Sequence, residues 1–281
     1  LATGRVSLSS MRAHLALASG ADVLVFQRCF TDAGLQALQE LRSLKQVRKV
    51  YDADDLDSRI RITNASYRQT LKDARGRMAK AIGLCDRLVV STQPLAQALS
   101  GTSDDIRVVA NRLAPGMWGV EPPKRDIGRP RRKGKPRVGW AGSTSHYGDL
   151  KMIADVIRDL ADEVDWVFMG MCPEEIRPYV KEFYAGVPTL EWPRHLMAQD
   201  WDLAIAPLES HAFNECKSNL KLLEYGWCAM PVVCSDVAPY QGDLPVVRVK
   251  NRHKDWCDAI RATLADGTQA RAQGLALQRK V

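Results

Sequence analysis

Short apolar runs alternate with helical segments along most of the chain, and this alternation limits the possible folds more than any other feature. Apolar runs of strand length fall at residues 22–26, 49–52, 87–91, 106–110, 137–141, 165–169, 202–208 and 245–249. Helical spacing is found at 31–44, 71–84, 93–99, 149–160 and 254–264, in a segment starting near Glu174, and in one starting at Ser218. Apolar strands that alternate with helices of roughly a dozen residues are typical of parallel sheets with right-handed crossover connections.

The same pattern restarts after a basic segment, which predicts two domains of one class. Residues 124–137 carry eight basic residues and one acid in a stretch that also contains Pro and Gly. We therefore predict an α/β protein of two Rossmann-like domains, at residues 1–117 and 137–281, joined by a basic linker at 118–136. Their parallel sheets are expected to face each other across a cleft, which is the default place for a ligand.

The basic segment is interpreted first as a solvated linker. It has no interleaved aromatic residues and lies in no recognisable nucleic-acid module, so we expect no nucleic-acid partner. Attraction to an anionic membrane surface or to a phosphate-bearing substrate stays open as an alternative. The net charge of +7 is compatible with all of these interpretations.

Cysteine spacing and hydropathy bear on the compartment. The seven cysteines are scattered without a CxxC pair, which argues for reduced thiols in the cytosol and against a structural zinc site. No apolar run approaches the ~18 residues that indicate a membrane span, and no signal peptide is visible. We expect a cytoplasmic protein without a metal or other cofactor, with peripheral contact at the inner face of the membrane as an open alternative.

The stretch from Asp202 to Tyr240 contains the densest functional chemistry. It reads as an apolar strand, a polar loop, a helix and a second apolar strand. The loop contains Glu209, His211, Asn214, Glu215 and Lys217. Backbone N–H groups at the helix start, near Ser218 and Asn219, form an anion site that Lys217 could complete.

Glu224 lies six residues after Ser218, which corresponds to about 9 Å along a helix. This distance suits a carboxylate that binds ribose hydroxyls while the helix start binds phosphate. The plain alternative is that Ser218 is only a helix cap and Glu224 an exposed helix residue.

A second candidate site follows the strand at 137–141. Gly139 and Gly142 are expected to let the backbone approach a phosphate closely. Ser143, Thr144 and His146 can donate hydrogen bonds to it. A tight turn with a purely structural role is the alternative.

The first half offers fewer candidates. Arg28 follows an apolar strand, and Asp52, Asp54 and Asp55 follow the next one. We expect Arg28, Asp54 and Asp55 to face the cleft; metal binding by the DxD pattern and simple helix capping are alternatives. His195 and His211 are interpreted as structural or surface residues. The tryptophans are predicted to lie mostly in the core or at interfaces.

These segments resemble one known family. The string FNECKSNLKLLEYGWCAMPVVCSDVAPY at 213–240 resembles the donor-binding region of glycosyltransferase family 4, the group 1 glycosyltransferases with the GT-B fold. Looser matches are VGWAGS at 138–143, VYDADDL at 50–56, VFQR at 25–28 and VVANR at 108–112. The family has a pair of glutamates that brackets seven residues. Here Glu224 occupies the second position and Cys216 the first.

The resemblance implies a retaining, metal-independent transfer of a sugar from a nucleoside diphosphate to a glycan or lipid-linked acceptor. It assigns catalytic roles to Lys217, Glu224 and Glu209. It assigns donor binding to Gly142, Ser143, Thr144, His146, Asn214, Ser218, Asn219 and Glu224. A non-catalytic nucleotide-sugar-binding or partner-binding module is the alternative that Cys216 and the short first domain leave open. A nucleotide-sugar epimerase is disfavoured because no acid/base pair is evident.

Overall fold

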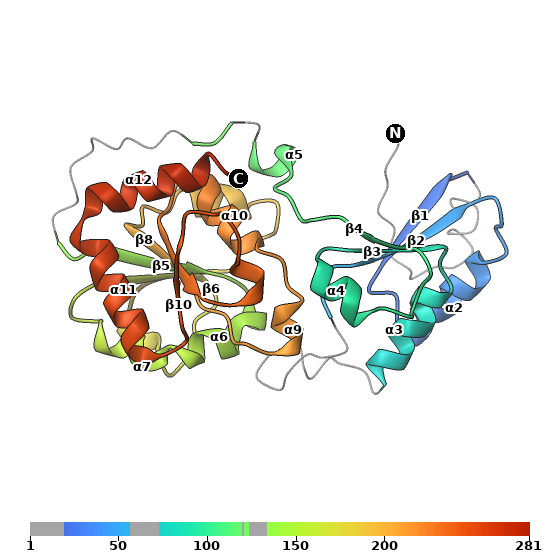
Figure 1. The fold of residues 1–281 in the computed structure, drawn as a ribbon, viewed down its shortest axis with the longest axis horizontal. Coiled ribbons are helices and arrows are strands. Elements are labelled where there is room, and N and C mark those ends of the chain that lie inside the picture. The colour runs from blue at the N-terminus through green and yellow to red at the C-terminus, as the bar shows by residue number, and fades with distance from the viewer. Residues whose placement is uncertain (1–19, 57–72, 120, 124–133) are drawn as a thin grey trace. The chain divides into compact units, whose positions relative to one another are not determined.

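A computed structural model describes residues 20–56, 73–119, 121–123 and 134–281. The chain divides into two compact units (Figure 1). The first runs to Ala110 and includes Cys216–Ser218, and the second comprises Asn111–Glu215 and Asn219–Val281. Most of the predicted basic segment, residues 124–133, lies outside the described residues.

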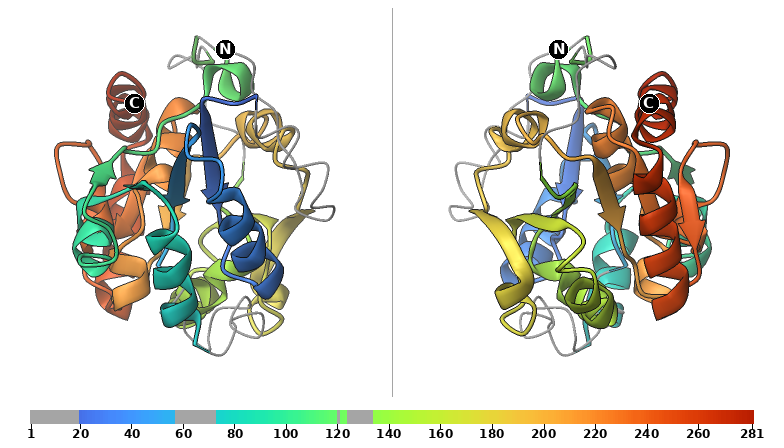
Figure 2. Two further views of the ribbon diagram at one scale, coloured as in Figure 1. Left: turned by 90° about the vertical axis from the view of Figure 1, so that its right-hand side faces the viewer. Right: turned by 90° about the vertical axis from the view of Figure 1, so that its left-hand side faces the viewer.

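The first unit is a four-stranded parallel sheet with helices. Its strands, in the sheet order β1-β2-β3-β4, are β1 (Val23–Gln27), β2 (Arg48–Ala53), β3 (Arg87–Val90) and β4 (Ile106–Val108). Its helices are α2 (Asp32–Leu41), α3 (Ala74–Gly83) and α4 (Gln93–Ala98). Thr31 caps α2, because its side chain accepts a hydrogen bond from Gly34 N. Helices α2 and α3 lie side by side (Figure 2).

The second unit is a six-stranded parallel sheet in the order β10-β9-β8-β5-β6-β7. Its strands are β5 (Arg137–Ala141), β6 (Asp165–Gly170), β7 (Val180–Ala185), β8 (Leu203–Ala206), β9 (Val232–Ser235) and β10 (Val247–Val249). Its α-helices are α5 (Pro115–Trp118), α6 (Tyr147–Met152), α7 (Ala154–Asp159), α8 (Trp192–Met197), α9 (Ala212–Glu215), α10 (Leu220–Trp227), α11 (His253–Ala265) and α12 (Gly267–Gln278). This strand order reverses direction between β5 and β8, as in doubly wound dinucleotide-binding sheets. The predicted fold class, α/β with two parallel Rossmann-like sheets, is confirmed.

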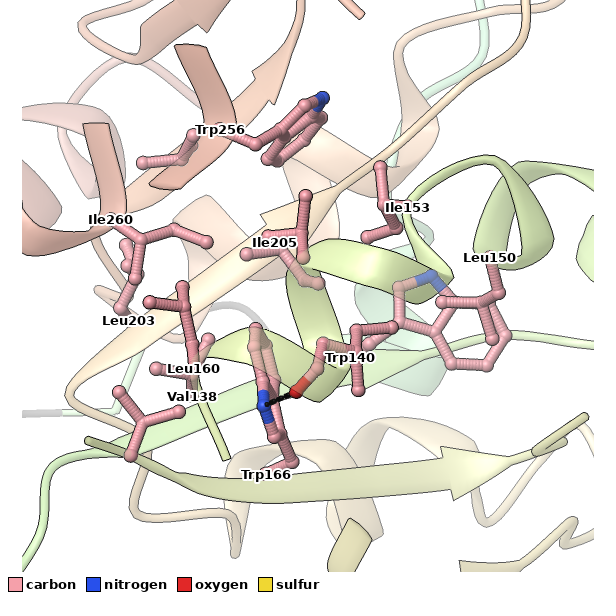
Figure 3. Packing of buried hydrophobic residues seen from close by; sticks show 14 of the residues in the cluster. Val138, Trp140, Leu150, Ile153, Leu160, Trp166, Leu203, Ile205, Trp256 and Ile260 are labelled. Carbon is pink, nitrogen blue, oxygen red and sulfur yellow. Dashed lines mark hydrogen bonds between the residues drawn. The ribbon is translucent and has the colours of Figure 1, made fainter. Parts of the chain in front are cut away.

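Two apolar clusters cover the two faces of the second sheet. Alternate residues of each strand point to opposite faces, and Trp140 and Ala141 accordingly belong to different clusters. The cluster of Trp140 includes side chains from α6, α7 and α11 (Figure 3). Trp166 lies wholly inside it and donates a hydrogen bond from Nε1 to the Ile157 carbonyl oxygen at 2.8 Å. Most tryptophans are buried, as predicted.

The prediction of a helix that starts near Glu174 is wrong. The chain instead forms a 3-10 turn at Arg177–Tyr179 and then the edge strand β7. Pro178 lacks the N–H that a helix interior requires, and the valine and aromatic residues of β7 favour a strand. The helix predicted at 149–160 is also divided, because Ile153 (φ −108°, ψ 19°) interrupts it between α6 and α7.

Candidate functional site

The strand order reverses between β5 and β8, and in open α/β sheets ligands bind at the carboxyl ends of the strands at such a switch point. The β5–β8 pairing covers only Val138 with Leu203 and Gly139 with Ala204. Beyond these pairs the two strands have no common register. The turn that follows β5 and the loop that follows β8 therefore form the two sides of the candidate site.

The turn after β5 is tightly packed. Gly142 N donates a hydrogen bond to the Met169 carbonyl oxygen at 3.0 Å. A Cβ atom on Gly142 would lie 2.6 Å from Trp140 Cζ2 and 3.1 Å from Lys221 Nζ, so no side chain fits there. Ser143 and Thr144 follow with exposed side chains. The turn thus presents polar groups to solvent on a backbone that is fixed from behind.

Gly139 has a different role from the one expected. A Cβ atom on it would lie 1.8 Å from Trp201 Cδ2. The buried indole ring therefore occupies the space beside β5, and Gly139 serves core packing rather than approach to a phosphate. Gly170, at the end of β6, has φ +98°, and a Cβ there would lie 2.2 Å from the Gly142 carbonyl oxygen. This position requires glycine for both reasons.

Asp149, near the start of α6, joins the turn to the loop after β8. Its Oδ2 lies 2.7 Å from His146 Nδ1. Its Oδ1 accepts hydrogen bonds from Glu209 N at 2.8 Å and from Asn214 Nδ2 at 3.1 Å. Three of the predicted site residues, His146, Glu209 and Asn214, are thus brought together by one carboxylate.

The loop after β8 is anchored on both sides. Asn214, on α9, is 4% exposed and donates a second hydrogen bond to the Glu209 carbonyl oxygen at 3.0 Å. Leu208 N donates to Ser235 Oγ at 2.8 Å, and Asn251 Nδ2 donates to the Leu208 carbonyl oxygen at 2.9 Å. The backbone of this loop is therefore defined by side chains from the sheet and its neighbouring segments.

Helix α10 lies against the end of β5. Asn219 is its N-cap and makes no capping hydrogen bond with its side chain. Lys221 Nζ donates to the Ala141 carbonyl oxygen at 2.5 Å, and Ala141 N donates to Tyr225 Oη at 2.9 Å. The pairing of β5 with β8 ends before Ala141, and these contacts give the Ala141 N–H and carbonyl oxygen their hydrogen-bond partners. Lys221 is also packed on the rings of Trp140 and Tyr225.

Glu224 lies on the same helix and is only partly exposed. Burial raises the pKa of its carboxyl group. The Lys221 charge and a hydrogen bond from Trp192 act in the opposite direction on this pKa. The carboxylate is therefore desolvated but oriented, and the interpretation of Glu224 as a freely exposed helix residue is wrong.

The other predicted residues belong to the first unit. Arg28 follows β1 with φ +53°, and its guanidinium Nη2 lies 3.8 Å from the Asp55 carboxylate. Lys217 Nζ, grouped in this unit with Cys216 and Ser218, lies 3.6 Å from the same carboxylate. The backbone carbonyl of Asp54 accepts a hydrogen bond from Ser91 Oγ at 3.0 Å. Among the described residues, no cluster of His, Cys, Asp and Glu could hold a metal ion.

Sequence reasoning missed Asp149, Lys221, Tyr225 and Trp192. Asp149 could have been noticed because it follows His146 by three residues, a spacing that places two side chains on one face of a helix. Lys221 precedes Glu224 by three residues, which is again a same-face spacing, and Tyr225 directly follows Glu224. Their partner Ala141 lies 80 and 84 residues away in the chain, and nothing local indicates it.

The described residues contain no helix with the length and apolar character needed to cross a membrane. No family model matches the chain, and no curated protein sequence matches it either. Solved structures do match. HepE of Anabaena, solved with UDP-glucose, is 13% identical with a TM-score of 0.67, and the match covers 96% of this chain and 76% of HepE.

Two further structures match over 96% of this chain. A glycosyltransferase from Rickettsia africae is 11% identical with a TM-score of 0.58, and 77% of it is covered. The lipopolysaccharide outer core galactosyltransferase WaaB is 14% identical with a TM-score of 0.53, and 76% of it is covered. The fold of this chain is therefore that of the GT-B glycosyltransferases.

Proposed function

We propose that this chain is a glycosyltransferase that moves a sugar from a nucleoside diphosphate to a glycan or lipid-linked acceptor, with retention and without a metal or cofactor. The observation that carries the proposal is the arrangement of α10 at the β5–β8 switch point. There a desolvated carboxylate, Glu224, lies one helical turn from the buried ammonium group of Lys221. The fold shared with HepE, solved with UDP-glucose, supports a nucleotide-sugar donor.

The proposed roles follow from the chemistry of each group. Glu224 accepts hydrogen bonds from ribose hydroxyls. The backbone N–H groups at Ser218 and Asn219 and the side chain of Lys217 stabilise the charge of the departing diphosphate. The turn at Gly142, Ser143 and Thr144 supplies further donors to phosphate oxygens.

Thermal shift measurements with UDP, GDP and dTDP test donor binding. A nucleotide at 100-fold its dissociation constant stabilises the folded chain by about 2.7 kcal/mol. Glu224→Ala and Lys217→Ala should reduce this stabilisation, whereas Asp162→Asn, a substitution at an exposed carboxylate before the amino end of β6, should leave it unchanged. Absence of a shift with all three nucleotides would refute the donor site.

A non-catalytic nucleotide-sugar-binding module is the second candidate. It is favoured by Cys216, a buried thiol at the position where the resemblance places a carboxylate near the donor sugar. Hydrolysis of the donor, measured as release of the nucleoside diphosphate, separates the two functions. Binding without any release, with or without candidate acceptors, would favour the module over the enzyme.

A further inference from the structure

Tyr240 is a buried residue at the edge of the sheet that carries the proposed donor site, and the proposed function gives it no role. It ends the 3-10 helix η5 (Ala238–Tyr240), which follows β9. It is 2% exposed and belongs to the apolar cluster that also contains Ala141, at the end of β5, and Leu208, after β8. Because β5, β8 and β9 are parallel, their carboxyl ends lie at one edge of the sheet.

The backbone of Tyr240 is held by hydrogen bonds, whereas its hydroxyl has none within the described part of the chain. Tyr240 N donates to the Val237 carbonyl oxygen at 3.0 Å, and Arg248 Nε donates to the Tyr240 carbonyl oxygen at 2.6 Å. Among the described residues, the unpaired side-chain atoms that are shut off from solvent include Trp140 Nε1 but not Tyr240 Oη. The hydroxyl is therefore a donor on a fixed backbone that a ligand can reach.

Two carboxylates define the chemistry around this hydroxyl. Burial raises the pKa of Tyr240 well above its ordinary value, and the charges of Asp149 and Glu224 act in the same direction. The phenol therefore stays protonated and remains a neutral O–H donor. Phosphate oxygens are disfavoured next to two carboxylates because like charges repel, whereas a neutral sugar hydroxyl is not.

Asn214 adds an unused acceptor beside one of these carboxylates. Its Nδ2 donates to Asp149 Oδ1 at 3.1 Å and to the Glu209 carbonyl oxygen at 3.0 Å. Since a carbonyl oxygen can only accept, these bonds fix the orientation of the amide, and Oδ1 receives no hydrogen bond from any described residue. Helix α9, which carries Asn214, contacts η5. The surroundings of Asp149 thus offer one unused donor and one unused acceptor, the pair of groups that a sugar hydroxyl needs.

We propose that the Tyr240 hydroxyl binds the sugar of the donor, by donating a hydrogen bond to one of the sugar's hydroxyl groups. The proposal rests on the proposed function, because it needs a nucleotide sugar at this edge of the sheet. A buried hydroxyl without a partner costs free energy, and a ligand that supplies an acceptor removes this cost. Tyr240 therefore favours the sugar conjugate over the free nucleotide.

Tyr240→Phe tests this contact, because it removes the hydroxyl and keeps the ring in the apolar cluster. Calorimetric titration compares UDP with UDP-glucose, GDP with GDP-mannose, and dTDP with dTDP-glucose. We expect the variant to bind the conjugate about tenfold more weakly, the size of one hydrogen bond, and to change the affinity for the free nucleotide less than about threefold. Its Tm should equal that of the wild type, because the hydroxyl forms no hydrogen bond with the described chain.

Tyr179→Phe is the matched control. Tyr179 is 36% exposed and directly precedes β7, so it lies at the amino end of a strand in the same parallel sheet. The substitution removes the same atom far from the carboxyl ends and should change neither binding nor Tm. Analogues of the conjugate that each lack one sugar hydroxyl then identify the contacted group: without that hydroxyl, the wild type and Tyr240→Phe should bind equally.

The outcomes distinguish this inference from the proposed function. If the wild type binds nucleotide and conjugate but Tyr240→Phe binds the conjugate equally well, the inference is overturned and the donor site remains. An equal loss of affinity for nucleotide and conjugate overturns it as well, because the hydroxyl would then act on the nucleotide. A lower Tm of the variant also overturns it, because the hydroxyl would then have a partner in the protein. If the wild type binds none of the nucleotides, the donor site fails and the inference fails with it.

Discussion

The hydrogen bond between Tyr225 and Ala141 gives the most quantitative test of how the carboxyl end of β5 is stabilised. Tyr225 is fully buried, and its hydroxyl oxygen accepts a hydrogen bond from Ala141 N at 2.9 Å. Tyr225→Phe removes only this oxygen and leaves the ring in place. The Ala141 carbonyl keeps its hydrogen bond from Lys221, but the Ala141 N–H loses its acceptor in a buried position.

A buried donor without an acceptor costs about 1–3 kcal/mol, so we expect a loss of about 2 kcal/mol in the free energy of unfolding. For a domain of this size, about 2 kcal/mol lowers Tm by about 4–8 °C. Differential scanning calorimetry or a urea titration measures this loss. Amide hydrogen exchange gives a local readout, because the Ala141 amide should exchange faster in the variant.

Tyr147→Phe is the matched control. Its hydroxyl contacts the Glu175 carboxylate at 3.0 Å in an exposed position, where water can replace the lost partner. We expect a change within about 0.5 kcal/mol. Equal stability losses for the two variants, or no loss for Tyr225→Phe, would refute the claim that the hydroxyl completes the end of β5.

Three further predictions concern α10 and β5. Burial raises the pKa of Glu224 in the folded chain above its pKa in the unfolded chain. Wild-type stability should therefore fall as pH rises from the unfolded-state pKa to the folded-state pKa. In Glu224→Gln, which has no group to titrate, this fall in Tm with pH should be smaller. Trp192→Phe removes a hydrogen bond that lowers this pKa, so the fall should extend to higher pH in the same melts. Gly139→Ala should cost about 2–3 kcal/mol in urea titrations because its Cβ meets the Trp201 ring, whereas Gly83→Ala, which meets nothing within 4 Å, should not destabilise.

The fold followed from the sequence where the signal was local. Apolar runs of strand length predicted nearly every strand, and the helical spacing at 31–44 predicted α2. The failure near Glu174 was also local. Pro178 has no N–H for a helix interior, and the segment forms a 3-10 turn followed by β7 instead of a helix.

The site could be predicted only in part because its contacts join distant segments. The sequence indicated that the turn after β5 and the loop after β8 carry polar chemistry. It could not indicate that Asp149 lies between them, because the hydrogen bonds from Asp149 to Glu209 and Asn214 span 60 and 65 residues. The role of Gly139 was hidden for the same reason, since the ring that excludes a side chain belongs to Trp201.

Helix α10 both supports the end of β5 and carries the proposed ribose ligand. Lys221 and Tyr225 lie four residues apart and hold Ala141, while Glu224 between them is the proposed ribose ligand. A substitution on α10 therefore changes donor affinity and the stability of β5 together. Tyr240 differs, because Tyr240→Phe removes a hydroxyl that forms no hydrogen bond within the described residues and should change affinity with little change in Tm. Comparing the two quantities for each variant separates residues that contact the donor from residues that hold the site in place.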